Sequence, residues 1–250
     1  MRVLLAIPVY NESRYLRGVV EEVKRHVDNV LVVDDGSTDA TPDLLACMPG
    51  IAVIRHPRNL GYGQSLIDAF SYAICHEMDW IITMDCDRQH EPAGIPDFLA
   101  AIEADDCDII SGSRYLPAQA DGDSPPADRR AINASITCVL NRTLNLGITD
   151  AFCGFKAYRV SCLHGLKITE PGYAMPLQLW VHAARRGLRI REVPVRLIYN
   201  DPKRSFGGPL NDPEHRRRHY QAVLEKALAE DLGSLAGCYC RVSGDPCCRC

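Results

Sequence analysis

The sequence predicts an α/β fold in which a mostly parallel, doubly wound sheet carries helices on both faces. Three observations predict it. Apolar runs of strand length alternate along the first 115 residues with segments whose apolar residues recur at helical spacing. Strand and helix in regular alternation indicate βαβ units, which build parallel sheets. Polar clusters follow directly after several of the apolar runs, where ligands bind in such sheets.

The first half of the chain alternates between strands and helices. Continuous apolar runs, typical of strands buried on both faces, predict strands at 3–9, 30–33, 51–55, 80–84 and 108–111. Helical spacing of apolar residues predicts helices at 15–27, 41–47, 66–74 and 95–102. The first run is short, contains Pro8 and precedes no small-residue cleavage site, so it is interpreted as a strand and not as a signal peptide.

The second half is less regular. Residues 121–128 contain Gly, Ser and Pro and predict a loop. The pattern then predicts a helix at 130–146, a strand at 155–159, a helix at 176–186 and a strand at 189–195. Asp212 and Pro213 supply an N-cap and a first helical proline for a last amphipathic helix. We expect one domain over 1–199, a mobile basic and Gly-rich loop over 200–211, the helix over 212–232 and a Cys-rich tail over 233–250.

The composition limits the classes of function. With 46% apolar and 24% charged residues, the chain is globular and not disordered. Its 28 Lys and Arg against 32 Asp and Glu give a net charge of −4, which argues against nucleic acid as a partner. No run reaches the roughly 20 apolar residues of a spanning helix. Without an export signal, a cytoplasmic location is expected.

Five of the 12 cysteines lie in the last 13 residues. The last residues include Cys238, Cys240, Cys247, Cys248 and Cys250. If residues 244–246 turn the chain, four thiolates would meet around Zn²⁺. Because the spacing is not a standard C-x₂-C pair, a thiol-rich end without metal is the alternative.

Polar residues gather after four of the predicted strands, at 8–12, 34–39, 85–90 and 112–115. Asn, Asp and Gly favour turns, which explains one such cluster but not four at the ligand-binding edge of a sheet. Asp85 and Asp87 give the most specific indication, since residues i and i+2 of an extended segment point to one side. Gln89 adds a neutral oxygen, and the three residues predict a Mg²⁺ or Mn²⁺ site.

These segments together resemble the family 2 glycosyltransferases, which have the GT-A fold, and in particular the branch that makes polyprenyl- and dolichyl-phosphate sugars. The matching segments occur in family order at 8–12, 33–39, 59–63, 84–90, 112–114, 150–155 and 192–194. The resemblance implies a metal-dependent, inverting transfer of a sugar. The donor would be of the GDP-mannose or UDP-glucose type, and the acceptor a polyprenyl or dolichyl phosphate.

The resemblance also implies roles for individual residues. The donor-binding residues are Pro8, Tyr10, Asn11, Glu12, Val33, Asp35, Gly61, Asp85, Cys86, Asp87 and Gln89. The acceptor and its phosphate would meet Arg114, Arg129, Arg130, Lys203 and Arg204. The expected catalytic residues are Asp87, Asp150 and Arg114. For Asp150 the open roles are a general base, an acceptor-orienting residue and a plain turn residue. Lys203 and Arg204 would belong either to a mobile lid that closes over the phosphates or to a plain solvated loop.

Several features keep other functions open. Cys153 stands where the family usually has Ser, and Ala174 and Gln178 stand where the lipid-phosphate branch often has Glu. The alternatives are transfer to a hydroxyl of a glycan or other envelope acceptor, and a nucleotide-sugar-binding protein without activity. A sugar-1-phosphate nucleotidylyltransferase would need a Gly-rich loop at 8–12, which the sequence lacks. At 216–218 three arginines begin the last helix, where peripheral contact with anionic lipid competes with a plain solvated face.

Overall fold

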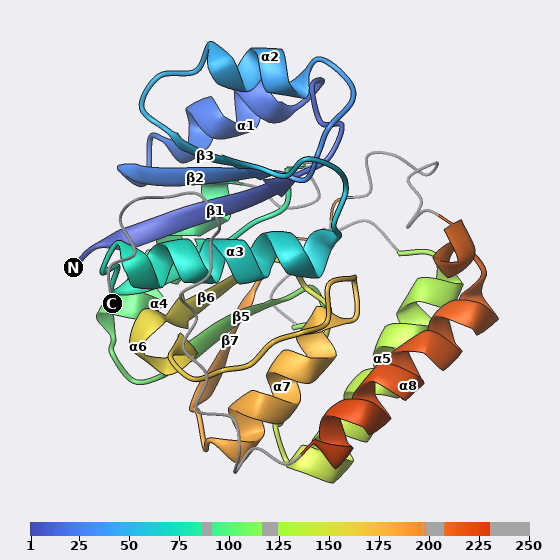
Figure 1. Cartoon of the computed structure of the whole chain (residues 1–250). Helices are drawn as coiled ribbons and strands as arrows, with labels where there is room; N and C mark the ends of the chain where they lie inside the picture. The colour runs from blue at the N-terminus through green and yellow to red at the C-terminus, as the bar shows by residue number, and fades with distance from the viewer. Residues whose placement is uncertain (87–91, 117–124, 197, 199–207, 231–250) are drawn as a thin grey trace.

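Seven strands form one mixed sheet at the centre of the part of the chain that the structure describes (Figure 1). The computed structural model describes residues 1–86, 92–116, 125–196, 198 and 208–230. The strands are β1 (Val3–Val9), β2 (Asn29–Asp34), β3 (Ala52–Arg55), β4 (Trp80–Thr83), β5 (Ile109–Ser113), β6 (Lys156–Arg159) and β7 (Ile190–Pro194). Their order across the sheet is β3-β2-β1-β4-β6-β5-β7.

All of these strands except β6 run in one direction. β1 pairs in parallel with β2 and β4, β2 pairs in parallel with β3, and β5 pairs in parallel with β7. β6 lies antiparallel between β4 and β5. The sheet is therefore mostly parallel, as the sequence predicts. Because β6 is reversed, the residues that precede it arrive at the edge where the other strands end.

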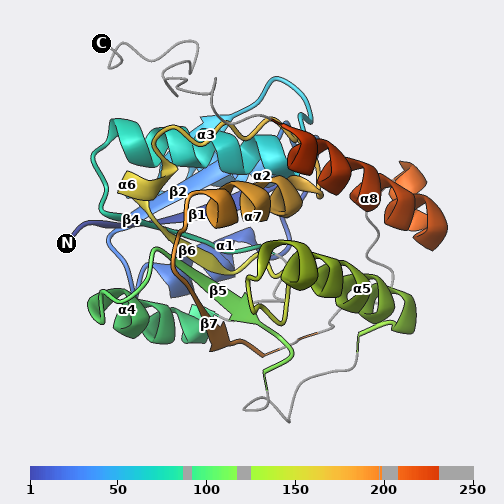
Figure 2. The same ribbon diagram turned by 90° about the horizontal axis from the view of Figure 1, so that it is seen from below.

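Helices cover both faces of the sheet (Figure 2). α1 (Leu16–Val23), α2 (Thr41–Ala46) and α4 (Ile95–Glu103) pack on one face. α3 (Tyr62–Cys75), α6 (Val160–Leu163) and α7 (Met175–Arg185) pack on the other face. Side chains alternate along β1, so that Leu5 and Ile7 join the first core while Leu4 and Ala6 join the second. This alternation of an all-apolar strand is what allows helices on both faces.

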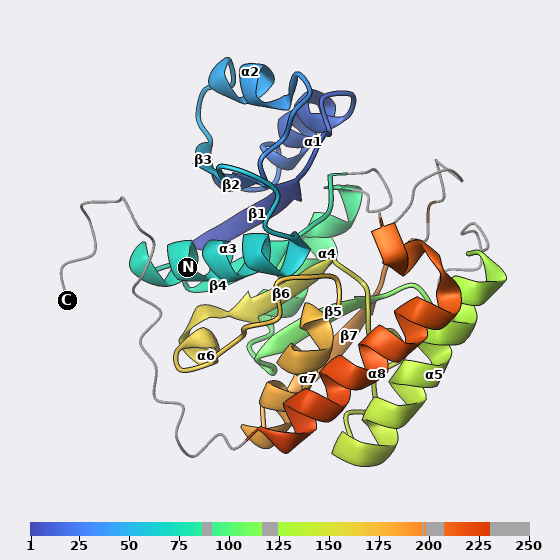
Figure 3. The ribbon, with the colours of Figure 1, turned by 45° about the vertical axis from the view of Figure 1, so that its right-hand side comes forward.

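Two further helices extend the second face. α5 (Ala127–Leu144) and α8 (Pro213–Ala229) lie side by side and contact α7 (Figure 3). Short 3₁₀ helices, η1 (Pro92–Gly94) and η2 (Gly208–Asn211), precede α4 and α8. Asp212 caps α8 by accepting the His215 N–H at 2.6 Å, which confirms the predicted helix start. None of the helices in the described part of the chain combines the length and the apolar character needed to cross a membrane.

Two expectations from the sequence need correction. Helix α5 begins at Ala127, inside the stretch 121–128 that its composition predicts as loop. Arg216 is only 3% exposed, so it is not part of the exposed basic surface that the sequence predicts at 216–218. Because α8 packs along α5, the guanidinium donates to Asp128 Oδ2 at 2.6 Å and to the Leu210 carbonyl at 3.0 Å. The two arginines that follow, at 217 and 218, do pair with an exposed glutamate of the same helix.

Candidate active site

A cleft of about 880 Å³ opens at the edge where the parallel strands end. Residues that follow β1, β2, β4 and β5 line it, together with the start of α3 and parts of α5 and α8. Among the predicted site residues its walls contain Pro8, Tyr10, Asn11, Glu12, Asp35, Gly61, Asp85, Cys86, Arg114 and Arg129. The structure thus gathers residues from distant parts of the sequence around one cavity.

The other predicted residues that the structure describes do not line the cleft. Val33 belongs to the sheet core, and Arg130 is exposed and does not line the cleft. Asp150 is fully buried and contacts Arg114. Asp87, Gln89, Lys203 and Arg204 lie outside the described residues, as does the Cys-rich tail with its predicted zinc site.

Asn11 shapes the cleft wall that follows β1. Its φ of 58° is in the left-handed region, which Asn adopts more readily than most residues. The side-chain Oδ1 accepts the N–H groups of Thr38 and Asp39 at 2.8 and 3.2 Å, and its own N–H donates to Ser37 Oγ at 2.9 Å. The loop after β1 is thereby tied to the loop after β2, which fixes the wall beside Tyr10.

Asp35 follows β2 and lines the same cleft. Its Oδ1 accepts the Leu60 N–H at 2.7 Å and lies 2.7 Å from His56 Nδ1, and its Oδ2 accepts the Gly61 N–H at 2.9 Å. The other ring nitrogen of His56 lies 2.8 Å from Asp68 Oδ2 on α3. The Asp35 carboxylate is therefore held in place from three directions.

Asp85 follows β4 and lies beside the start of α3. Tyr62, in the first turn of that helix, hydrogen-bonds to Asp85, and burial together with this carboxylate raises the pKa of the tyrosine well above its usual value. A Cβ added to Gly154 would lie 2.4 Å from Asp85 Oδ2. Only glycine at this position leaves the carboxylate its present place.

The surroundings of Asp85 suit a divalent cation. A carboxylate at the wall of a polar cleft is the hard oxygen ligand that Mg²⁺ and Mn²⁺ prefer. Asp85 thus fits as one ligand, while its predicted partners at 87 and 89 lie outside the described residues. Within the described ranges, no three His, Cys, Asp or Glu side chains gather as a metal site.

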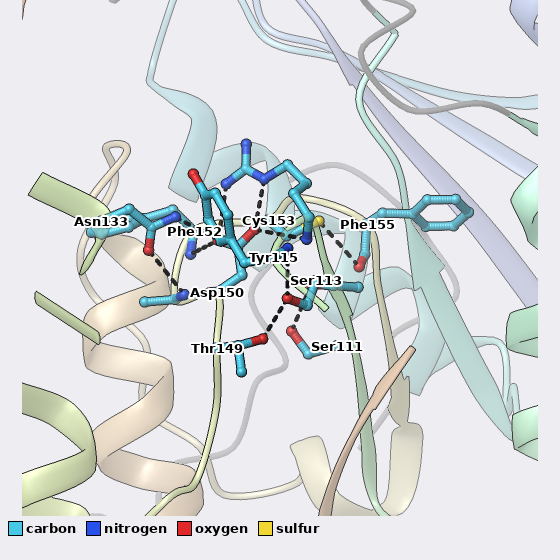
Figure 4. Close-up of polar contacts among 12 residues, drawn as sticks. Ser111, Ser113, Tyr115, Asn133, Thr149, Asp150, Phe152, Cys153 and Phe155 are labelled. Atoms are coloured by element: carbon cyan, nitrogen blue, oxygen red, sulfur yellow. Dashed lines mark hydrogen bonds and ion pairs between the residues drawn. The ribbon is translucent and has the colours of Figure 1, made fainter. Parts of the chain in front are cut away.

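Arg114 follows β5 and forms a bidentate ion pair with Asp150, a residue labelled in Figure 4. Its Nε and Nη2 donate to the two carboxylate oxygens at 2.6 and 2.9 Å, and its backbone N–H donates at 3.3 Å. Asn133 Nδ2 and the Phe152 N–H add hydrogen bonds at 2.7 and 3.1 Å. Burial alone would raise the pKa of Asp150, but the guanidinium and these donors hold it well below its usual range.

Glu192 of β7 holds the loop that carries Asp150, the carboxylate of this ion pair. Its Oε1 accepts the N–H groups of Thr149 and Asp150 at 2.8 and 3.2 Å, and its Oε2 accepts Thr149 Oγ1 at 2.8 Å. Thr149 Oγ1 also lies 2.5 Å from Ser113 Oγ, as Figure 4 shows. The glutamate of the segment 192–194 therefore fixes the loop that carries Asp150, a role that the sequence does not reveal.

A wall of aromatic and cationic side chains completes the cleft. Phe152 and Tyr220 stack with ring centroids 4.8 Å apart, and Tyr62 and Tyr173 stack at 5.5 Å. All four rings line the cavity, together with Ile132, Pro176, Arg129 and Arg216. This part of the cleft offers apolar surface beside positive charge, which suits a ligand with an anionic head and an apolar chain.

Two buried residues behind the cleft were not predicted as part of it. Lys156 begins β6, donates to the Cys153 carbonyl and lies 5.4 Å from the centre of the Trp180 ring. Burial lowers the pKa of this lysine. Burial also raises the pKa of the Cys153 thiol to about 11, so the cysteine that replaces the usual serine stays protonated near neutral pH.

Gln178, which stands where the lipid-phosphate branch often has Glu, holds a loop beside the cleft. Its Oε1 accepts the N–H groups of Thr169 and Glu170 at 2.8 and 3.0 Å. The loop it holds contacts the start of α3, where a Cβ on Gly63 would lie 2.3 Å from the Glu170 carbonyl oxygen. An amide at 178 therefore shapes the cleft from outside, through the loop that ends in Tyr173.

The arrangement of sheet, helices and edge cleft is the GT-A fold of glycosyltransferases. The solved structure of glucosyl-3-phosphoglycerate synthase from Mycobacterium tuberculosis, in complex with Mn²⁺, uridine diphosphate and phosphoglyceric acid, matches it with a TM-score of 0.69. That match covers 91% of this chain and 78% of the other at 19% identity, and at this identity it concerns the fold alone.

Comparison at the level of sequence gives the family. Residues 5–166 match the family described as Glycosyl transferase family 2, and the chain belongs to that family. It is similar to an undecaprenyl-phosphate mannosyltransferase from Micrococcus luteus, with 31% identity over 79% of this chain and 84% of the other. It is also similar to a polyprenol monophosphomannose synthase from Mycolicibacterium smegmatis, with 30% identity over 78% and 76% of the two chains.

Proposed function

We propose that this protein transfers a sugar, with inversion at the anomeric carbon, from a nucleoside-diphosphate sugar to a polyprenyl or dolichyl phosphate. The observation that carries the proposal is that one part of the cleft offers carboxylates and another part offers arginines and aromatic rings. Two carboxylates, Asp35 for the nucleotide base and Asp85 for a metal-bound diphosphate, line the same cavity as four arginines and seven aromatic rings. The acceptor class is supported by the relatives named as an undecaprenyl-phosphate mannosyltransferase and a polyprenol monophosphomannose synthase.

The donor would lie along the ends of β1, β2 and β4. The Asp35 carboxylate can accept an N–H of the base. Asp85, with Asp87 and Gln89 as the sequence predicts, would hold Mg²⁺ or Mn²⁺. When bound, the metal supplies positive charge that stabilises the leaving nucleoside diphosphate.

Arg114 would supply fixed positive charge at the reacting phosphates. Its guanidinium is already oriented by Asp150, so little reorganisation is needed when charge develops. Asp150 accepts five hydrogen bonds from its neighbours and is held ionised, which makes it a poor general base. We therefore assign it as a positioning residue. A lipid phosphate is already anionic at neutral pH and attacks without a base, provided that it is held in line.

The acceptor would lie against the aromatic wall. Arg129 and Arg216 offer positive charge for its phosphate, and the stacked pair Phe152 and Tyr220 offers apolar surface for the first units of its chain. Arg216 is held by Asp128 across the two helices, so its position does not depend on the ligand.

Nucleotide release tests the proposal. The protein is incubated with Mn²⁺ and a panel of UDP- and GDP-sugars, with a polyprenyl phosphate or with the matched polyprenol that lacks the phosphate. We expect release of UDP or GDP that requires the phosphate and Mn²⁺. Equal release with the polyprenol would instead favour a hydroxyl acceptor, and no release with any donor would contradict an enzymatic role.

The packing of Gly154 against Asp85 gives a second prediction. In Gly154→Ala the new methyl group displaces the Asp85 carboxylate, which is the end of one side chain, so the fold is retained. We expect the affinity for Mn²⁺ in the presence of the nucleotide to fall about 10- to 100-fold. Calorimetric titration with Mn²⁺ measures this.

Gly94→Ala serves as its matched control. The Cβ added there would meet only the edge of the Phe155 ring, at 3.2 Å, and Mn²⁺ affinity should stay at the wild-type level. If the two alanine variants bind Mn²⁺ equally well, Asp85 does not hold the metal.

A further inference from the structure

A row of hydrogen-bonded polar side chains, centred on His56, lies behind the wall that Asp35 contributes to the cleft. His56 follows β3 and is 6% exposed, and its two ring nitrogens lie 2.7 Å from Asp35 Oδ1 and 2.8 Å from Asp68 Oδ2. Gln64 Nε2 donates to the other oxygen of Asp68 at 3.1 Å. The row therefore runs from the end of one strand, through the histidine, to two side chains of α3.

His56, at the centre of this row, is positively charged. Hydrogen bonds from both ring nitrogens to carboxylates outweigh the effect of burial and raise the pKa of His56 from 6.5 to about 9. In the charged form both nitrogens are donors, so Asp35 and Asp68 each receive an N–H. One buried cation thus faces two carboxylates.

The remaining contacts leave Asp35 able to receive a ligand. Within the described residues, Oδ1 accepts from His56 and the Leu60 N–H, whereas Oδ2 accepts only the Gly61 N–H. A carboxylate oxygen accepts about two hydrogen bonds. Because Asp35 lines the cleft, one acceptor position on Oδ2 is left for a donor group that enters it.

We propose that His56, held by Asp68, is a positioning residue that fixes Asp35 to accept an N–H of the nucleotide base of the sugar donor. The inference rests on the proposed function, since it requires a nucleotide donor in this cleft. Without the histidine, the carboxylate would lose its side-chain partner and, among the described residues, would be held by two backbone N–H groups of the loop before α3. The rotation of the Asp35 carboxylate would no longer be fixed. The negative charges of Asp35 and Asp68 would lack the cation between them.

The test compares substitutions that keep or remove one link of the row. His56→Ala removes both N–H groups, whereas His56→Asn keeps an amide N–H near the position of Nδ1 but does not reach Asp68. Asp68→Asn keeps the histidine and removes the charge that holds its far nitrogen. His76→Asn is the matched control, because His76 lies at the opposite end of α3 and stacks on Tyr72.

The first readout separates donor binding from turnover. We expect His56→Ala to raise the donor KM, and the Kd of UDP or GDP in the presence of Mn²⁺, at least about tenfold while kcat changes less than about threefold. His56→Asn should restore part of the affinity, and His76→Asn should match the wild type. A residue with a merely structural role would lower thermal stability without this division between KM and kcat.

The second readout is the pH dependence of donor binding. The charged groups that face the His56 ring are Asp35 after β2 and Asp68 on α3, while Arg55 of β3 pairs with Asp34 at 3.3 Å. Because the pKa of His56 is raised in the folded protein, the charged contact is complete below pH 6.5 and is lost as the pH rises through about 9. Donor affinity should fall over that range, and in Asp68→Asn the fall should begin at lower pH.

Several results would overturn the inference. If UDP or GDP binds the wild type, and His56→Ala and Asp68→Asn bind it equally well at every pH, the inference alone is wrong. If His56→Ala does not fold, the KM and pH profile of Asp68→Asn decide in the same way. Binding of neither nucleotide by the wild type would overturn the proposed function together with this inference.

Discussion

Asp150→Ala is expected to lower the free energy of unfolding by about 3–5 kcal/mol, because it removes one partner of a buried ion pair. Asp150 is fully buried, and Arg114 binds it through two side-chain nitrogens. The substitution leaves that guanidinium without its carboxylate and Asn133 without its acceptor. Urea unfolding at neutral pH, followed by circular dichroism, measures the loss. Turnover should fall as well, since Arg114 is no longer oriented.

Two comparisons make this result specific. Asp97→Ala removes an exposed aspartate of α4 and should change stability by less than about 0.5 kcal/mol. Asp150→Asn keeps the shape without the charge. Because the folded-state pKa of Asp150 lies below its ordinary value of 3.8, its contribution is present at neutral pH and is lost as the pH falls below that value. The difference between the wild type and Asp150→Asn should therefore shrink in acid. Equal stabilities of the alanine variants at 97 and 150 would contradict the account.

Asp85→Ala is expected to lower kcat/KM for sugar transfer by about 10³-fold, because it removes a carboxylate proposed to hold the metal at the leaving diphosphate. The same loss is expected for Asp87→Ala from the sequence alone. Steady-state release of UDP or GDP measures the effect. Titration with Mn²⁺ should show weakened binding that does not depend on turnover.

The fold of the Asp85 variant should remain intact. The side chain is only partly buried, and Tyr62 can turn its hydroxyl to water in the cleft. We expect a melting temperature close to that of the wild type. Full activity with unchanged Mn²⁺ affinity would show that Asp85 has no role in metal binding, and loss of activity through unfolding would be recognised by the changed melting temperature.

The order of strands and helices could be predicted from the sequence because each element carries its own period of apolar residues. The run at 3–9 and the helical spacing at 15–27 indicate β1 and α1 without any knowledge of their neighbours. The direction of β6 could not be predicted this way, since apolar alternation is the same for a parallel and an antiparallel strand. Yet that reversal brings Asp150 to the edge where Arg114 lies.

Several predicted site residues directly follow strands, whereas some of the missed ones lie within helices. Asp35, Asp85 and Arg114 stand where a polar residue interrupts an apolar run, which marks them in the sequence. Asp68 and Asn133 lie on helices, where a polar residue looks like part of a solvated face. Their contacts depend on which helix face meets the sheet and on partners more than ten positions away in the chain.

Arg216 is a residue that the sequence predicts as exposed and that the structure buries. Three consecutive arginines at the start of a helix indicate an exposed basic surface, but α8 turns the first of them toward Asp128 on α5. Tertiary packing decides which one of three identical neighbours enters the cleft wall. The helical spacing does favour Arg216, which lies four positions before Tyr220 and eight before Leu224 on the buried face of α8, but the run of three arginines obscures this signal.

The mass and the anomeric configuration of the lipid product show whether this protein transfers a sugar to a polyprenyl phosphate with inversion. The protein is incubated with Mn²⁺, a nucleotide sugar that supports release, and a polyprenyl phosphate, and the extracted lipid is analysed by mass spectrometry and by NMR of the anomeric proton. The proposed transfer yields polyprenyl phosphate that carries one sugar residue, with the anomeric configuration opposite to that of the donor. Unmodified polyprenyl phosphate beside released nucleotide, or a product of retained configuration, would contradict it.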